Sequence, residues 1–150
     1  MEGLKNEMKL EFTSRSSNEG FARVAVGAFV AELDPTVDEL ADIKTAVSEA
    51  VTNSIIHGYN LKDGLIVITC CVQGQEVEIS VMDAGQGITD IKKAREPLYT
   101  TRPELERSGM GFAFMEAFMD EVAVESHVNV GTTVTMRKTI GRGSWKQKCL

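Results

Sequence analysis

The segment over residues 77–83 constrains the fold most, because apolar and polar side chains alternate along it without a break. The positions that share its apolar face are Val77, Ile79, Val81 and Asp83. This period of two predicts a strand with one buried face. An apolar, β-rich run over 65–72 precedes it, and Gly74 lies between the two. We therefore expect a hairpin whose row of buried positions ends in a carboxylate.

A long helix is predicted before this hairpin. Thr36 and Glu39 have the spacing of a capping box, which indicates a helix start, and the pattern continues to about His57, where Gly58 ends it. An apolar stripe at three- and four-residue spacing runs along it and consists of Leu40, Ile43, Val47, Val51 and Ile55.

The remaining elements complete a two-layer pattern. They are a strand over 8–13, a helix from a Ser16–Glu19 capping box to about Leu33, a helix carrying Phe112, Met115 and Met119, and strands over 122–128 and 132–139. The polar stretch over 90–108 is longer than an ordinary connection, which indicates a functional lid. This order predicts an α/β, two-layer sandwich, with a mixed, mostly antiparallel sheet covered on one face by helices.

Composition limits the functional classes. The 150 residues suffice for one domain that folds without disulfides or metal, and we place it at 1–140, followed by a basic tail over 141–150. Asp and Glu outnumber Lys and Arg by 22 to 16, which argues against nucleic-acid binding. The longest apolar run is short of the roughly 18 residues that cross a bilayer. The three cysteines lack metal-ligand spacing, so we expect reduced thiols and a cytoplasmic protein.

Three polar residues lie four apart on the long helix. Glu49, Asn53 and His57 share a face that differs from the apolar stripe. A solvated polar face would explain such a trio, but Asn is a poor helix former at an interior position. A carboxylate one turn from an amide instead favours a base beside an oxygen ligand for Mg²⁺.

Three short segments contain glycines next to a predicted element: one follows the strand over 77–83, one precedes the last helix, and one begins the last strand. Asp83 is followed by Gly85 and Gly87, a pattern that fits either a tight turn or a pocket whose floor accepts a hydrogen bond from an adenine amino group. Gly109 and Gly111 precede a helix, where backbone N–H groups bind anions, although a flexible loop explains them equally. Thr132 faces inward with Val134, either as a satisfied core hydroxyl or as a pocket residue.

Taken together and in this order, these segments resemble the nucleotide-binding boxes of the GHKL superfamily of ATPases and kinases, which has the Bergerat fold. A closer resemblance, to the anti-sigma F factors of endospore-forming bacteria, covers nearly the whole chain. The matching segments are Asn6-Glu-Met-Lys-Leu, Phe21-Ala-Arg23-Val, Glu49-Ala-Val-Thr-Asn53, Ile56-His-Gly-Tyr59-Asn60, Pro103-Glu-Leu-Glu-Arg-Ser-Gly-Met-Gly-Phe112 and Met119-Asp-Glu.

The resemblance implies a role for each matched residue. Glu49 corresponds to the general base, Asn53 to the Mg²⁺ ligand, and Asp83 to the adenine-binding carboxylate. The residues around the nucleotide correspond to Gly85, Gly87, Gly109, Gly111 and Thr132. Arg23 corresponds to an arginine that contacts protein partners. Arg107, with Arg102, is a candidate for stabilising phosphate charge, and a solvated loop charge is the alternative.

The resemblance implies a protein-serine/threonine kinase that uses ATP, leaves ADP and requires Mg²⁺. It further implies inhibition of a sporulation sigma factor, sigma F, and phosphorylation of a small anti-anti-sigma factor. The helix over 21–33 is apolar nearly all round, which indicates burial on several sides or an interface, and the family forms homodimers. Two alternatives remain open: a kinase for a stress-response sigma factor, and a non-catalytic, nucleotide-switched binding module.

Overall fold

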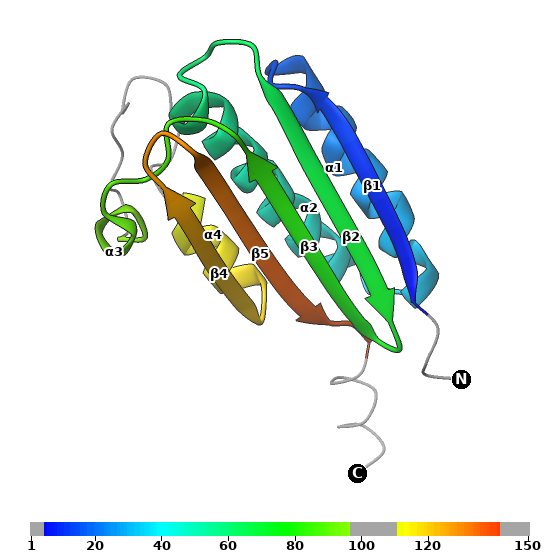
Figure 1. The fold of residues 1–150 in the computed structure, drawn as a ribbon. Helices are drawn as coiled ribbons and strands as arrows, with labels where there is room; N and C mark the ends of the chain where they lie inside the picture. Colours follow the sequence, from blue (N-terminus) through cyan, green and yellow to red (C-terminus); the bar gives the residue numbers. More distant parts are fainter. Residues whose placement is uncertain (1–4, 97–110, 142–150) are drawn as a thin grey trace.

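The structure is a computed structural model that describes residues 5–96 and 111–141. Its elements, in chain order, are β1 (Asn6–Thr13), α1 (Ser17–Val30), a 3₁₀ turn η1 (Ala31–Leu33), α2 (Val37–Asn53), a π-helix η2 (Ser54–Gly58), β2 (Leu65–Gln73), β3 (Glu76–Asp83), α3 (Ile91–Ala94), α4 (Gly111–Phe118), β4 (Glu121–His127) and β5 (Gly131–Thr139) (Figure 1). The predicted order of strands and helices is confirmed.

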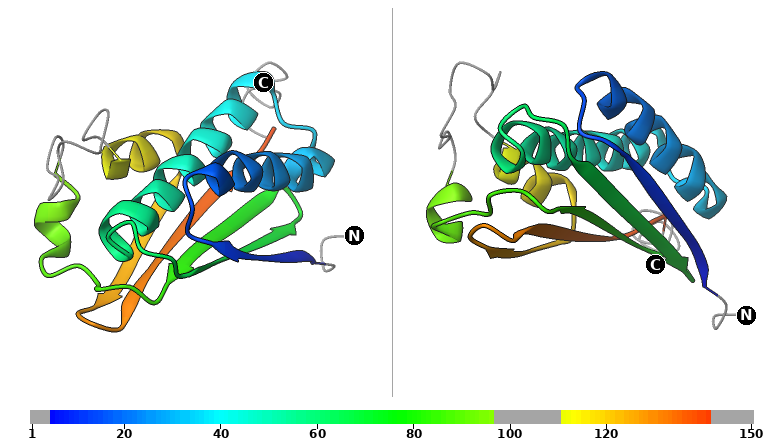
Figure 2. Two further views of the ribbon diagram at one scale, coloured as in Figure 1. Left: turned by 90° about the horizontal axis from the view of Figure 1, so that it is seen from above. Right: turned by 45° about the horizontal axis from the view of Figure 1, so that its top comes forward.

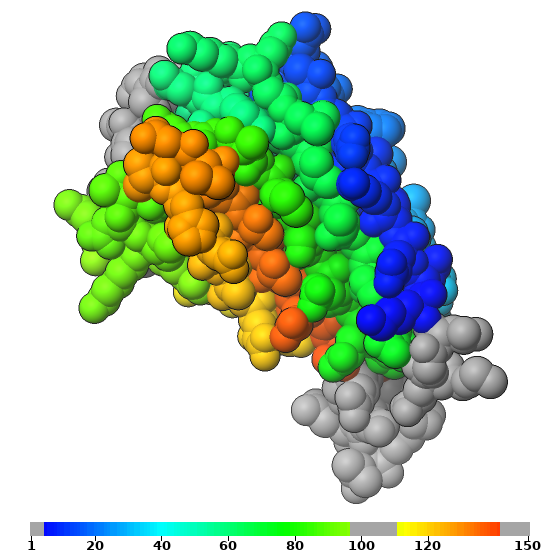
Figure 3. Space-filling view, viewed as in Figure 1, coloured from blue at the N-terminus to red at the C-terminus, as the bar shows by residue number. Residues whose placement is uncertain are grey.

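The strands form one sheet with the order β1-β2-β3-β5-β4. Every pairing among the described strands is antiparallel, so the sheet is simpler than the mixed one expected. Helices α1, α2 and α4 cover one face, as the two-layer prediction requires (Figure 2). Figure 3 displays the other face, where side chains from neighbouring strands lie at the surface. In the register of β3 and β5, Asp83 lies opposite Thr132.

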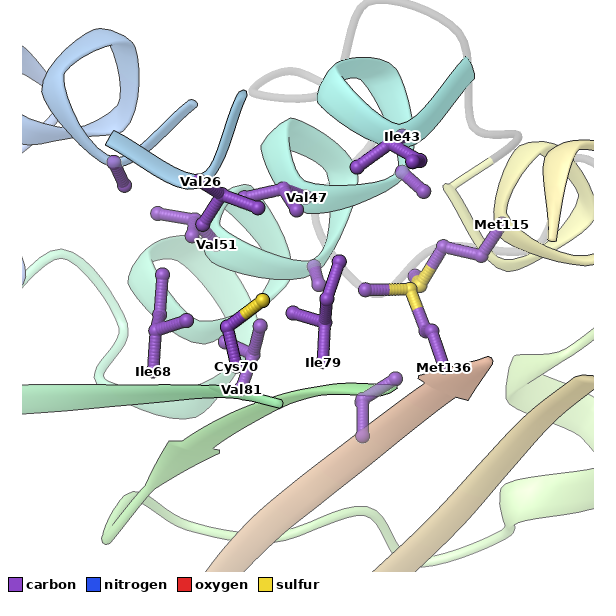
Figure 4. Close-up of a cluster of buried hydrophobic side chains, with 14 of the residues drawn as sticks. Val26, Ile43, Val47, Val51, Ile68, Cys70, Ile79, Val81, Met115 and Met136 are labelled. Atoms are coloured by element: carbon purple, nitrogen blue, oxygen red, sulfur yellow. The ribbon is translucent and has the colours of Figure 1, made fainter. Parts of the chain in front are cut away.

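The core lies between the helical layer and the sheet. In Figure 4, Val47 and Val51 of α2 lie above the sheet, from which Ile79 of β3 rises toward the helical layer, while Met115 of α4 meets Met136 of β5. All five side chains are fully buried. Burying one such side chain stabilises the fold by about 1.5–3 kcal/mol. The predicted stripe of α2 is therefore the face that holds the helix on the sheet.

The two predicted capping boxes have opposite outcomes. At α2, the Glu39 N–H donates to Thr36 Oγ1 at 3.0 Å, and the Thr36 N–H donates to Glu39 Oε1 at 2.9 Å, so the box is confirmed. At α1, Ser16 has helical dihedral angles and its side chain makes no cap, so this prediction is wrong. Glu19 instead accepts a hydrogen bond from Ser48 of α2.

Helix α1 buries one face. Ala22, Val26 and Val30 lie against α2 and the sheet with no exposed area, whereas the side chains of Phe21 and Val24 are 56% and 59% exposed. Among the described residues, burial on several sides therefore does not hold, and the exposed apolar strip with Phe21 and Val24 leaves the other expectation, an interface, as a prediction.

Several predictions lie outside the described residues. These are Gly109, Arg102, Arg107 and most of the expected lid over 90–108, together with residues 142–150 of the basic tail. Of the described cysteines, Cys70 is buried, and this burial raises the pKa of its thiol to about 12. Within the described ranges, no helix has both the length and the apolar character needed to span a membrane.

Candidate nucleotide site

A cavity of about 590 Å³ lies between the end of α2, the loop after β3, the β4–β5 turn and the start of α4. Its volume falls in the range of about 300–1,000 Å³ that is usual for small-molecule sites. The sequence-predicted residues that line it are Asn53, His57, Asp83, Gly87, Gly111 and Thr132. The structure therefore brings together segments that the sequence places far apart.

Asp83 is the buried charge of this cavity. Its side chain is only 7% exposed. Oδ2 accepts a hydrogen bond from the Ser54 hydroxyl at 2.8 Å, and Oδ1 accepts one from the Gly85 N–H at 2.9 Å. Burial raises the pKa of this carboxyl group, and the hydrogen bonds from Gly85, Ser54 and Thr132 partly oppose the rise. The predicted core-facing carboxylate is therefore confirmed, and hydrogen-bond donors from Ser54 and Gly85 contact its two oxygens.

Glycines allow the backbone to close around Asp83. A Cβ on Gly58 would lie 2.9 Å from the Asp83 carboxyl carbon, and a Cβ on Gly85 would overlap the Gly58 carbonyl oxygen. Gly131 has φ 144° and a Cβ there would overlap the carbonyl oxygen of Asp83. Gly85 is thus needed for chain packing, and it is not among the described residues that line the cavity. Gly87 has φ 78° and lies against the His127 carbonyl.

Sequence reasoning missed three residues of this site. Ser54 begins the π-helix and reaches Asp83, and Gly58, predicted simply as a helix end, packs flat against the same carboxylate. Gln86 bonds both carbonyls at the end of η2: its N–H donates to Gly58 O at 2.9 Å, and its side-chain amide donates to His57 O at 2.6 Å. The closest signal for Ser54 and Gly58 was their position beside Asn53 and His57.

Glu49 and Asn53 lie one turn apart, against the start of α4. A Cβ on Gly111 would lie 3.3 Å from Glu49 Oε2 and 3.3 Å from both amide atoms of Asn53. Within the described part of the chain, Asn53 Nδ2 is a buried side-chain nitrogen without a hydrogen-bond partner. Glu49 is half-buried and lies beside the cavity rather than among its described lining residues.

Thr132 joins the cavity to the β4–β5 turn. It is buried, and its hydroxyl lies 2.7 Å from that of Ser126, which also accepts the Ile88 N–H at 2.7 Å. The inward direction predicted for Thr132 is confirmed. The two interpretations of Thr132, a hydrogen-bonded core hydroxyl and a pocket residue, are compatible, because its hydroxyl lies within hydrogen-bond distance of Ser126 and the residue lines the cavity.

Arg23 lies apart from the cavity lining, on α1. It forms an ion pair with Glu19 at 3.3 Å, and its Nη1 lies 3.5 Å from Ser48 Oγ on α2. Ser48 also donates to Glu19 at 3.1 Å, and it directly precedes Glu49.

The comparisons with known proteins agree with this arrangement. The histidine kinase-like ATPase domain family matches residues 12–138. The anti-sigma F factor of Geobacillus kaustophilus is 61% identical over 140 residues, covering 93% of this chain and 96% of the relative. That of Clostridium botulinum strain Alaska E43 is 62% identical over 135 residues, covering 89% and 94%.

A solved structure supports the fold. The crystal structure of the RsbU and RsbW domains from a Mycobacterium tuberculosis protein aligns with a TM-score of 0.65 at 22% sequence identity. The alignment covers 90% of this chain and 32% of that one. The cavity framed by Asp83, the histidine kinase-like domain and the near-complete match to curated relatives lead to one conclusion: the chain belongs to the anti-sigma F factor family and is built on a histidine kinase-like ATPase domain.

Proposed function

We propose that this protein is an ATP-dependent protein-serine kinase that phosphorylates a small anti-anti-sigma factor and also binds and inhibits a sporulation sigma factor. The observation that carries the proposal is the placement of Glu49 and Asn53 against Gly111, beside a cavity whose floor is the buried Asp83. A pure binding module has no use for a carboxylate at that position.

The donor set fits a magnesium nucleotide. The buried Asn53 amide has a nitrogen that no described residue bonds, so it can contact a phosphate oxygen while its own oxygen binds Mg²⁺. Asp83 can accept a hydrogen bond from the 6-amino group of adenine. Bound Mg²⁺ would neutralise charge on the phosphates.

Glu49 would act on the protein substrate. Its carboxylate accepts the proton of the substrate serine hydroxyl while that oxygen forms a bond to the γ-phosphorus. The bond from phosphorus to the β–γ bridging oxygen breaks, and ADP leaves. Such a base contributes about 10²–10⁴-fold to rate. Phosphoryl transfer asks little else of the protein beyond positioning and charge stabilisation.

The exposed part of α1 is the proposed partner surface. Phe21 and Val24 present apolar area beside the Arg23–Glu19 pair, and this combination of apolar anchor and arginine is typical of protein interfaces. We assign this surface to the sigma factor and the anti-anti-sigma factor, and we expect the protein to form homodimers as its family does.

The test is transfer of labelled phosphate from ATP to a purified anti-anti-sigma protein by the Glu49→Gln variant. We expect a loss of at least about a hundredfold in rate with ATP binding retained. Glu125→Gln, at an exposed carboxylate on β4, is the matched control. Full transfer by Glu49→Gln would remove Glu49 as the base. No transfer by the unmodified protein, with ATP bound, would favour the non-catalytic switched module.

A further inference from the structure

Ser54 makes an unusual contact for a helical serine. A serine within a helix commonly bonds back to the carbonyl oxygen four residues earlier. The Ser54 hydroxyl instead donates across to Asp83 Oδ2 at 2.8 Å, and its side chain is 5% exposed. Because a buried hydroxyl is costly without a partner, this bond fixes Ser54 and Asp83 together.

Three contacts fix the orientation of the Asp83 carboxylate. Ser54 holds Oδ2, the Gly85 N–H holds Oδ1, and Gly58 packs against the carboxyl plane so closely that a Cβ would lie 2.9 Å from Oδ2. An ionised carboxylate has about four acceptor positions, and the Ser54 hydroxyl, the Gly85 N–H and the Thr132 N–H take three of them, so one remains. All three hydrogen bonds come from donors and favour the ionised form against the effect of burial, and an ionised carboxylate can only accept hydrogen bonds.

We propose that Ser54 is a specificity-determining residue that positions Asp83 as a pure acceptor, so that the site selects purines with a 6-amino group over purines with a 6-oxo group. This inference rests on the proposed nucleotide site. A 6-amino group donates to the remaining carboxylate position, whereas a 6-oxo group sets an acceptor against an acceptor. Sites built to bond one such group reject the analogue that lacks it.

The test compares binding of ATP and inosine triphosphate by calorimetry, with the full-length chain and Mg²⁺. The triphosphate and ribose are common to both, so their ratio isolates the base. Ser54→Ala should weaken ATP binding about three- to tenfold and leave inosine triphosphate binding unchanged. The loss is smaller than that of a direct hydrogen bond to a charged group, because Ser54 acts on the adenine only through Asp83. The discrimination then falls by the same factor.

The control is Ser14→Ala. Ser14 is also a buried serine, but its hydroxyl donates to Lys62 O and accepts the Gly64 N–H, away from the cavity lining. It should lower thermal stability without changing the nucleotide ratio. Equal losses for both nucleotides in Ser54→Ala, or no loss for ATP, would overturn the role of Ser54 while leaving the kinase proposal intact. If the unmodified protein bound no ATP, both proposals would fall.

Discussion

Replacing Asp83 by Asn removes the charge of the nucleotide site while preserving its shape. The amide oxygen must face the Gly85 N–H, since the amide NH₂ group would meet that donor with another donor. The NH₂ group then occupies the position of Oδ2, beside Ser54, whose hydroxyl can rotate to accept it. An adenine amino group would now face a donor instead of a carboxylate.

Two effects of Asp83→Asn can be sized from these contacts: the loss of ATP affinity and the change in the free energy of unfolding. A hydrogen bond to a charged group is worth about 1.5–3 kcal/mol, which corresponds to an affinity loss of about 10- to 150-fold for ATP. Stability should change by less, about 1 kcal/mol, because weaker bonds from Ser54 and Gly85 are offset by easier burial of a neutral group.

The pH dependence gives a second readout of the same variant. Burial raises the pKa of Asp83 in the folded state, so the neutral carboxyl favours folding at low pH. That contribution is full below the ordinary value of 3.8 and is lost as the pH rises through the raised folded-state pKa. Asp83→Asn should remove this part of the stability profile.

Calorimetry with Mg-ATP and urea unfolding at several pH values measure these effects. Asp120→Asn is the matched control, because Asp120 also accepts a backbone N–H, from Thr139 at 2.8 Å, but lies outside the lining of the cavity. Wild-type ATP affinity in a folded Asp83→Asn variant would refute the assignment of Asp83 as the base-reading carboxylate.

Three further predictions concern backbone strain, a helix cap and the partner surface. Gly131→Ala should destabilise the fold by about 3 kcal/mol or more, because its Cβ overlaps the Asp83 carbonyl at positive φ, whereas Gly74→Ala, at φ 61° in open space, should cost about 1 kcal/mol in urea unfolding; similar costs would contradict the overlap. Burial would raise the pKa of Glu39, but bonds from the Thr36 and Gly141 N–H groups outweigh it and lower the pKa, so Glu39 stabilises the fold above pH 4.5 and loses this effect as the pH falls through the folded-state value. Glu39→Gln should flatten that part of the profile, and an unchanged profile would count against the cap. Arg23→Ala should weaken capture of a sigma factor about tenfold in pull-down or calorimetry with ATP affinity unchanged, and full capture would remove Arg23 from the interface.

Features formed by residues close together in the sequence were predicted correctly, whereas features that depend on distant residues were not. The Thr36–Glu39 box was predictable because both partners lie within one turn, and the Gly141 N–H that also bonds Glu39 uses the other carboxylate oxygen. Ser16 and Glu19 have the same spacing, yet Glu19 bonds Ser48, 29 residues away, and Ser16 takes helical dihedral angles. A contact across that distance leaves no trace in the local pattern.

The residues of the candidate site show the same difference between local patterns and distant contacts. Asp83 was predictable because it continues a strand's buried row, and Asn53 because it is out of place in a helix. Ser54 was missed because its partner, also 29 residues away, is reached through a π-turn that periodicity of 3.6 does not anticipate. The function of Gly58 as a packing surface depends on the same turn.

The cavity draws its walls from α2, the loop after β3, the β4–β5 turn and α4, so its lining runs from Ala50 to Val134. No short stretch of the unfolded chain can reproduce it. A nucleotide that binds there, as proposed, would bind the native state alone and shift the folding equilibrium by mass action. At a free concentration one hundred times its dissociation constant, this adds about 2.7 kcal/mol to the free energy of unfolding. The melting temperature and protease resistance of this chain should then follow the nucleotide supply of its surroundings.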